Sequence, residues 1–346
     1  MFLSIDHLPH VLKFKAALKK VSAVLLLPGI VLGLFALNAK AQSTFANDVA
    51  FPIKPIHLVV PFPAGGALDM VARIIAQPLG ERLGKPVWIE NRPGADGAIA
   101  ADYVAKSAPD GYTLLMATYG AMSALPSLHK SLPYDVVKDF TPITNTGKFD
   151  FFLFTHASVP AHQLSEFFAY VKTHPGEINY GTGNVGGIVG TAELSNLHQL
   201  HMVHIPYKGE VPLMNDLLSG RIQMMIGTPA NALEFVKAGK LNALVAFADQ
   251  RSLLLPHVPT MAELGYKSLS TVAWSGVFGP ANTPAPIAFK ISRNINEIML
   301  GAHVRQELDK QGFEAKGSTP AELGLYLKEQ LRSWSASIEL AGLSSD

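Results

Sequence analysis

Cysteine is absent from the 346 residues of this chain. Its absence excludes disulfide bonds, thiolate nucleophiles, zinc–cysteine sites and iron–sulfur clusters. An excess of one charge is absent too, since 28 Lys and Arg stand against 27 Asp and Glu, which gives a formal net charge of +1. Nucleic-acid-binding proteins usually carry a basic surplus on one face, so the composition indicates no nucleic-acid partner.

Short motifs of catalytic sites are also missing from the sequence. It contains neither a Gly-x-Ser-x-Gly nucleophile turn nor a His-Glu-x-x-His zinc motif. His198, His201 and His204 are spaced three apart, but the last two lead into a predicted strand, so we do not expect three convergent ligands. The sequence therefore predicts no catalytic residues, no metal site and no cofactor.

One long apolar run is present, and it lies near the N-terminus. Val21–Leu37 is almost entirely apolar, follows four lysines between positions 13 and 20, and precedes Ala39-Lys40-Ala41. These are the three parts of a secretory signal peptide, so we expect residues 1–41 to be cleaved off and the protein to reach the periplasm. A membrane anchor is the alternative, although the run is short for a bilayer span and Pro28-Gly29 interrupts it.

After this segment, β-branched apolar runs alternate with helical patterns. The alternation with short connections predicts an α/β protein built from doubly wound, parallel sheets. We expect Pro78 to kink or shorten the helix that contains it. The predicted strands are 56–60, 86–90, 112–117, 151–155, 178–180, 203–207, 222–226, 241–247 and 271–278, and the predicted helices are 67–83, 97–107, 164–173, one ending near 200, 211–218, 231–238, 286–300, 302–311 and 321–341.

Two glycine-rich loops stand between a predicted strand and a predicted helix. They are Pro61–Gly66 and Gly181–Gly187, and neither contains Lys or Arg. Ligands of doubly wound sheets bind beyond the carboxyl ends of the strands, and a helix N-terminus offers free N–H groups to an anion. The loops therefore predict an anion site made of backbone donors. Asp69 is typical of a helix-capping residue with Arg73 as its ion partner, and a ligand contact is the alternative.

The second loop also contains the pattern Gly-x-Gly-x-x-Gly in Gly181, Gly183 and Gly186. Glu210 follows the next predicted strand, where a dinucleotide site would have its ribose-binding acid. A lone motif of this kind is a weak indication, and an exported protein meets little dinucleotide. A dinucleotide-binding oxidoreductase is one alternative function, and an exported enzyme acting on a small organic acid is another.

A series of segments along the chain matches one known family in order. The segments are Pro61–Gly66 with Asp69 and Ala72-Arg73, Glu90–Ala95, Pro109–Leu114, Leu132–Asp135, Lys138–Phe140, Ile205–Gly209, Ala238–Leu241, Pro259–Glu263, Gly279–Ala281 and Thr283-Pro284. On these segments the chain resembles the substrate-binding proteins of tripartite tricarboxylate transporters, also called Bug receptors. Asp96, Gly181-Thr182 and Gly227 depart from the family pattern near the expected ligand loops.

The resemblance implies a type II-like periplasmic binding protein with two α/β lobes, a two-strand hinge and a ligand cleft between the lobes. We place residues 42–147 and 274–346 in one lobe and 148–273 in the other, with crossings near Gly147–Asp150 and Thr271–Trp274. The resemblance also implies a receptor and not an enzyme. It would capture a small organic carboxylate (a di- or tricarboxylate, an amino acid or an aromatic acid) for a tripartite permease or for sensing. We expect a monomer.

The family typically holds its ligand's carboxylate with backbone amides and ordered waters of the same two loops. We therefore expect the carboxylate to meet the N–H groups of residues 64–66 on one lobe, while the other lobe offers Thr182, Gly183 and Asn184, with side-chain hydrogen bonds from Thr182 and Asn184. The expected ligand-binding residues are Phe62, Ala64, Gly65, Gly66, Asp69, Thr118, Tyr119, Thr182, Gly183, Asn184, Gly187, Tyr207, Lys208 and Thr228.

Overall fold

The structure of the protein is a computed structural model that describes residues 51–266 and 273–343. These residues belong to one compact unit, Ala50–Asp346. Among the described helices, none is both long and apolar enough to cross a bilayer. The expected signal peptide at 1–41 lies outside the described residues.

The first of two sheets has six strands in the order β11-β4-β10-β3-β1-β2. β1 pairs in parallel with β2 and β3, as helical crossover connections require. β10 is antiparallel to both β3 and β4, and β11 is antiparallel to β4, so the sheet is mixed. Its strands are β1 (Ile56–Val60), β2 (Val87–Asn91), β3 (Thr113–Thr118), β4 (Phe140–Phe149), β10 (Ala273–Pro280) and β11 (Phe313–Ala315).

The second sheet has five strands in the order β7-β6-β8-β5-β9. β6 lies parallel to β7 and β8, whereas β5 is antiparallel to β8 and β9. This sheet is therefore mixed as well, and the expectation of purely parallel sheets was wrong. Its strands are β5 (Phe151–His156), β6 (Asn179–Thr182), β7 (Val203–Pro206), β8 (Met224–Gly227) and β9 (Leu241–Phe247).

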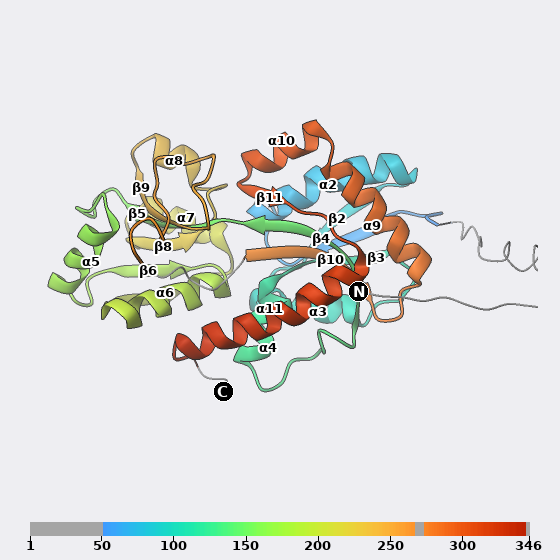
Figure 1. Cartoon of the computed structure of the whole chain (residues 1–346), viewed down its shortest axis with the longest axis horizontal. Coiled ribbons are helices and arrows are strands. Elements are labelled where there is room, and N and C mark those ends of the chain that lie inside the picture. Colours follow the sequence, from blue (N-terminus) through green and yellow to red (C-terminus); the bar gives the residue numbers. More distant parts are fainter. Residues whose placement is uncertain (1–50, 267–272, 344–346) are drawn as a thin grey trace, which may run out of the picture. The chain divides into compact units, whose positions relative to one another are not determined.

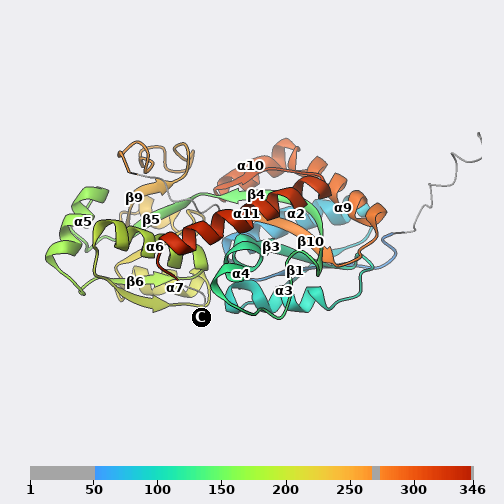
Figure 2. The same cartoon turned by 60° about the horizontal axis from the view of Figure 1, so that its bottom comes forward.

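Helices pack against both sheets, and one of them reaches from the first sheet to the second (Figures 1 and 2). This is α11, drawn in red, whose C-terminal end meets α6, since Asn196 Nδ2 donates a hydrogen bond to the Ala341 carbonyl. The helices are α2 (Ala67–Leu83), α3 (Ala98–Ala105), α4 (Leu125–Leu128), α5 (Leu164–Thr173), α6 (Val185–His198), α7 (Glu210–Leu218), α8 (Leu233–Lys237), α9 (Ala285–Met299), α10 (Ala302–Lys310) and α11 (Pro320–Leu340), with short turns η1 (Ala95–Gly97) and η2 (Gly120–Ala124).

The predicted elements correspond to observed ones, and the differences have physical causes. α2 continues past Pro78 to Leu83 and is capped by Gly84, which has a left-handed φ of 71°, so Pro78 does not shorten the helix, and a kink there stays a prediction. β4 was missed because its sequence, with three Thr, Pro142 and Gly147, shows no alternation of apolar and polar residues. Two register shifts against β10 accommodate this strand, one of them beside Pro142. β11 and α4 were missed because they are too short to show a period.

The chain passes from the first sheet to the second at Asp150. β4 ends at Phe149 and β5 begins at Phe151, and the returning strand β10 starts at Ala273, opposite Phe149. The crossing expected at Thr271–Trp274 lies partly outside the described residues. The lobe boundaries at 147/148 and 273/274 stay a prediction.

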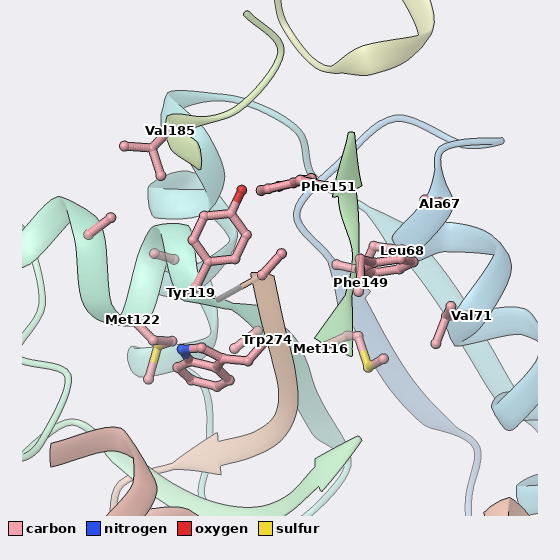
Figure 3. Close-up of a cluster of buried hydrophobic side chains, with 14 of the residues drawn as sticks. Ala67, Leu68, Val71, Met116, Tyr119, Met122, Phe149, Phe151, Val185 and Trp274 are labelled. Atoms are coloured by element: carbon pink, nitrogen blue, oxygen red, sulfur yellow. The ribbon is translucent and has the colours of Figure 1, made fainter. Parts of the chain in front are cut away.

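The main hydrophobic core contains buried residues of both sheets. Figure 3 shows part of it, in which Tyr119 lies among Val185, Phe151 and Trp274. The Tyr119 ring stacks on Trp334 of α11 at a centroid distance of 4.8 Å and meets Phe151 edge-on at 6.1 Å. Aromatic pairs of this kind add roughly 0.5–1.5 kcal/mol beyond area burial. A second, smaller core lies entirely within the second sheet's half.

Candidate ligand-binding pocket

A pocket lies where the carboxyl ends of β1, β3, β6, β7 and β8 come together. Strands of both sheets contribute, which is the place that open α/β sheets offer to ligands. Its wall is mostly apolar, with a few polar groups, and among the described residues it contains no Lys or Arg. The lining residues are Phe62, Pro63, Gly66, Ala67, Leu68, Thr118, Tyr119, Phe149, Phe151, Gly183, Asn184, Glu210, Val211, Thr228 and Ala273.

The size of the pocket limits its ligand to a small molecule. The cavity volume of the pocket is about 60 Å³. One water needs roughly 10–15 Å³ on that measure. The pocket therefore suits a compact ligand and leaves little room for a dinucleotide.

The N-terminus of α2 forms one side of the pocket. Its N-cap is Gly66, which makes no side-chain cap, and the first hydrogen bond of the helix runs from Met70 N–H to the Gly66 carbonyl. The N–H groups of the first helical turn therefore have no partner within the helix. Ala67 and Leu68, which belong to this turn, line the pocket. Two backbone donors and the positive end of the helix dipole are thus available to an anion.

The N-terminus of α7 forms a second uncapped helix end at the pocket. Its N-cap is Gly209, again without a side-chain cap, and Glu210 and Val211 line the wall. Gly209 has a φ of 108°, which favours glycine, and a Cβ there would lie 3.2 Å from Pro63 Cδ of the first loop. The two loops therefore approach each other closely across the mouth of the site.

The N-terminus of α6, in contrast, is already capped. Asn184 Oδ1 accepts a hydrogen bond from Gly187 N–H at 2.9 Å, and it also accepts one from the Tyr119 hydroxyl at 3.0 Å. The Val185 N–H donates to the carboxylate of Asp96, which comes from the loop before α3. Burial and the charges of Asp96 and Glu210 raise the pKa of Tyr119, which keeps its hydroxyl protonated. The donors of α6 are therefore used inside the protein.

Glu210 is the one acidic residue of the pocket wall among the described residues. Its carboxylate accepts hydrogen bonds from Asn184 Nδ2 at 3.0 Å, from Thr228 N–H at 3.2 Å and from Thr228 Oγ1 at 2.6 Å. Burial raises its pKa to about 7, because desolvation penalises the charged form more than these hydrogen bonds favour it. Glu210 is thus a titratable carboxyl group in the pocket wall, hydrogen-bonded to Asn184 and Thr228.

The structure brings half of the expected ligand-binding residues to the pocket wall. These are Phe62, Gly66, Thr118, Tyr119, Gly183, Asn184 and Thr228. The other seven, which do not line it, are Ala64, Gly65, Asp69, Thr182, Gly187, Tyr207 and Lys208. Their role in ligand binding stays untested, but most of them have other partners.

Asp69 is engaged within the first loop and helix. Its carboxylate accepts from Gly65 N–H at 3.0 Å, from Arg73 Nε at 2.8 Å and from Asn91 Nδ2 at 2.8 Å. Although burial opposes ionisation, these hydrogen bonds and the Arg73 charge together lower the pKa of Asp69. This arrangement fits the structural role that an acid in the first helical turn suggests.

Several expected donors also turn out to be paired. Gly65 N–H binds Asp69, and Gly66 N–H donates to the Pro63 carbonyl at 3.2 Å. Tyr207 donates its hydroxyl to Asp216 at 2.8 Å, and Thr182 Oγ1 lies 2.6 Å from His204 Nε2. The N–H groups of Gly65 and Gly66 therefore have partners inside the protein, and a role of Ala64 in ligand binding stays a prediction.

The glycines of the dinucleotide-like motif are explained by close packing. A Cβ at Gly181 would lie 2.5 Å from Ile222 Cδ1, and one at Gly183 would lie 2.6 Å from the Gly209 backbone. A pyrophosphate needs an open glycine face and free N–H groups at the helix start. Because Gly183 is covered and α6 is capped, the geometry disfavours dinucleotide binding.

The three histidines at positions 198, 201 and 204, which we did not expect to converge on a metal ion, lie in different surroundings. His198 on α6 stacks on Phe168, and His204 on β7 stacks on Tyr180, while His201 lies between the two elements. Across the described residues, no three His, Cys, Asp or Glu side chains come close enough to hold a metal ion.

Sequence reasoning missed eight residues of the wall. Most are apolar, and nothing in their spacing distinguishes them from core residues, although a helix start without a capping side chain could have indicated Ala67, Leu68 and Val211. Glu210 was noticed only as a ribose acid. The missed residues are Pro63, Ala67, Leu68, Phe149, Phe151, Glu210, Val211 and Ala273.

Comparison with known proteins places this geometry in a family. BugT of Bordetella pertussis is 34% identical over 315 residues, which are 90% of this chain and 96% of BugT. The periplasmic binding protein BugD matches with a TM-score of 0.81 at 30% identity, over 86% of this chain and all of BugD. MatC from Rhodopseudomonas palustris with bound malate matches with a TM-score of 0.76 at 31% identity, over 83% of this chain and all of MatC.

A family model described as "Tripartite tricarboxylate transporter family receptor" matches residues 71–343. This match confirms the resemblance, the two-sheet α/β fold of a periplasmic binding protein and the expectation of a receptor in place of an enzyme. With the relatives above matched over most of their length, the chain belongs to the family of tripartite tricarboxylate transporter receptors.

Proposed function

We propose that this protein is a periplasmic receptor that binds a small organic carboxylate in the pocket and presents it to a tripartite tricarboxylate permease. The observation that carries the proposal is the N-terminus of α2, where Ala67 and Leu68 line a small, mostly apolar pocket and their N–H groups have no partner within the helix. Such a site neutralises an anion without a cationic side chain.

The energetics of this site are sufficient for a carboxylate. Removing an anion from water costs several kcal/mol, and each hydrogen bond to a charged group returns about 1.5–3 kcal/mol. The N–H groups of Ala67 and Leu68, the Thr118 hydroxyl and ordered water can together offset that cost. The Thr118 Oγ1 supports this role, since it is buried and has no hydrogen-bond partner among the described residues.

Two solved relatives support the ligand class. The Rpa4515 protein of R. palustris was solved with adipate and matches with a TM-score of 0.82 at 30% identity, over 86% of this chain. MatC was solved with malate. Both are small organic acids, which agrees with the size of this pocket.

The test is to identify what the protein binds. Native mass spectrometry of protein isolated from the periplasm should show a bound small acid, and calorimetry with that acid should give a single site. Lys208→Ala serves as a control, because Lys208 is exposed and outside the pocket wall, and we expect less than a twofold change in affinity. Turnover of the acid would indicate an exported enzyme, and copurifying coenzyme absorbance would indicate an oxidoreductase.

We further propose that the two lobes close on the ligand about the crossings expected near Gly147–Asp150 and Thr271–Trp274. Small-angle scattering at saturating ligand should then show a smaller radius of gyration than scattering without ligand. An unchanged radius would contradict closure. Light scattering in the same samples tests the expectation of a monomer.

A further inference from the structure

We propose that Glu210 selects a ligand that carries an ammonium group besides its carboxylate, so that the protein is a receptor for amino acids and not for simple dicarboxylates. This inference rests on the proposed function and deepens it, because it concerns the same pocket. It is carried by the position of Glu210 and by the direction of the hydrogen bonds around it.

The neighbours of Glu210 all donate hydrogen bonds to it. Thr228 N–H is an obligate donor, and it lies 3.2 Å from Glu210 Oε1. Asn184 must present its amide nitrogen to Glu210, because its oxygen accepts from Gly187 N–H, which can only donate. Oε1 therefore receives two N–H groups and has no place for a proton on that side. Such a donor set favours the carboxylate form of Glu210.

The negative charge of Glu210 has no cationic partner among the described residues. No ion pair of Glu210 is formed there, and the described wall of the pocket contains no Lys or Arg. Oε1 already receives two donors, but Oε2 is contacted by Thr228 alone, so Oε2 can still accept a hydrogen bond from a ligand. A cationic donor would supply the missing charge and stabilise the ionised form.

A second carboxylate on the ligand would be repelled by Glu210. Two carboxylates in one small pocket repel each other, and one of them has to take up a proton before both fit. The ligand that matches the site thus has its carboxylate at the N-terminus of α2 and its ammonium group at Glu210. The close approach of Gly227, where a Cβ would lie 3.2 Å from Glu210 Oε1, shows that the carboxylate fills the space beside that strand end.

The experiment compares pairs of acids that differ by one amino group. Calorimetry at pH 7.5 would use L-leucine with 4-methylpentanoate, L-aspartate with succinate, L-glutamate with glutarate, and 4-aminobutanoate with butanoate. In at least one pair we expect the amino compound to bind tenfold or more tightly than its partner, a difference of about 1.4 kcal/mol. Glu210→Gln, which keeps the shape and an acceptor oxygen, should reduce that difference to less than threefold.

A matched control removes a carboxylate from the same helix outside the pocket. Asp216→Asn affects only the hydrogen bonds to Tyr207 and Arg221, so the preference for the amino compound should persist. Thermal unfolding of both variants shows whether each is folded. The proposal is wrong if no amino compound binds, if the partner acids bind as tightly, or if Glu210→Gln retains the preference. If only the diacids bind, the proposed function as a carboxylate receptor still holds and the preference for amino acids is wrong. If no acid binds, both proposals are wrong.

Discussion

The carboxylate of Asp96, in the turn before α3, accepts a hydrogen bond from the backbone N–H of Val185, the first residue of α6. The contact joins an element of the first sheet's half to one of the second. The other oxygen, Oδ1, is buried and has no hydrogen-bond partner among the described residues. Burial therefore raises the pKa of Asp96 to about 7, although the Val185 N–H acts in the opposite direction.

This contact makes stability depend on pH. Between the unfolded value of 3.8 and about 7, the folded protein binds more protons than the unfolded chain, so the free energy of unfolding falls as pH rises through that range. Asp96→Asn removes the titrating group and keeps an acceptor for Val185, so we expect a flatter pH profile and higher stability at pH 8. Urea unfolding at pH 4.5, 6 and 8 measures this.

Asp110→Asn is the control for Asp96→Asn, since Asp110 lies on an exposed turn beside Lys54. It should leave the pH profile close to that of the unmodified protein. The pKa of Glu210 is raised as well, so some dependence of the unfolding free energy on pH should remain in Asp96→Asn. An identical slope in Asp96→Asn and the unmodified protein would contradict the role of Asp96.

Gly65 offers a second test, because Gly84 has a similar backbone conformation but lies far from the pocket and can serve as its control. Gly65 and Gly84 have φ values of 81° and 71°, and a Cβ would meet nothing within 4 Å at either position. Alanine should cost roughly 1–2 kcal/mol of stability at both, since each is left-handed. Only Gly65→Ala should also weaken acid binding, because strain at this left-handed position would shift the backbone N–H that holds Asp69 at the start of α2. Equal affinities of the two variants would show that this loop does not shape the site.

Gly65→Pro should abolish acid binding altogether. Proline fixes φ near −65° and has no N–H to donate to Asp69, so the loop cannot keep its conformation. Calorimetry with a bound acid identified as above measures the loss. If Gly65→Pro binds normally while Lys208→Ala does not, an ion pair holds the ligand and the backbone site proposed here is wrong.

Tyr119→Phe should affect binding, whereas Tyr134→Phe should affect stability alone. Both rings are 6% exposed, and each hydroxyl donates one hydrogen bond, to Asn184 Oδ1 and to the Ala121 carbonyl respectively. Each substitution should cost about 0.5–1.5 kcal/mol of stability. Because Asn184 also binds Glu210, only Tyr119→Phe should lower ligand affinity, by roughly three- to tenfold. Chemical unfolding and calorimetry separate the two effects, and an unchanged affinity in Tyr119→Phe would count against the coupling.

We predict that the signal peptide is cleaved after Ala41 during export, so that the mature N-terminus is Gln42. The basic segment, the apolar run and Ala39-Lys40-Ala41 carry this prediction. Terminal sequencing of protein from the periplasmic fraction should begin at Gln42, and Ala41→Lys should leave the precursor uncleaved, because signal peptidase sites need small residues. Full-length protein beginning at Met1 in the membrane fraction would support the anchor instead.

Local patterns predicted the elements that depend on local forces. The helix 67–83 has the predicted ends, because its apolar spacing and its flanking glycines are both visible in the sequence. β4 was not predicted, since its Thr-rich sequence becomes a strand only through pairing with β10 and β11. The strands β5, β9 and β10 were predicted, but their antiparallel pairing was not, because pairing direction is not a property of one segment.

The sequence by itself determined the family, the absence of thiol chemistry and the presence of two uncharged, glycine-rich helix starts. Only the tertiary structure decided which donors are free, because Gly65, Gly66 and Asn184 find partners inside the protein whereas Ala67 and Leu68 do not find them within their helix. It also decided that Asn184, Glu210 and Thr228 meet at one wall. These three residues come from separate strand ends, and spacing along a chain carries no information about contacts made by packing.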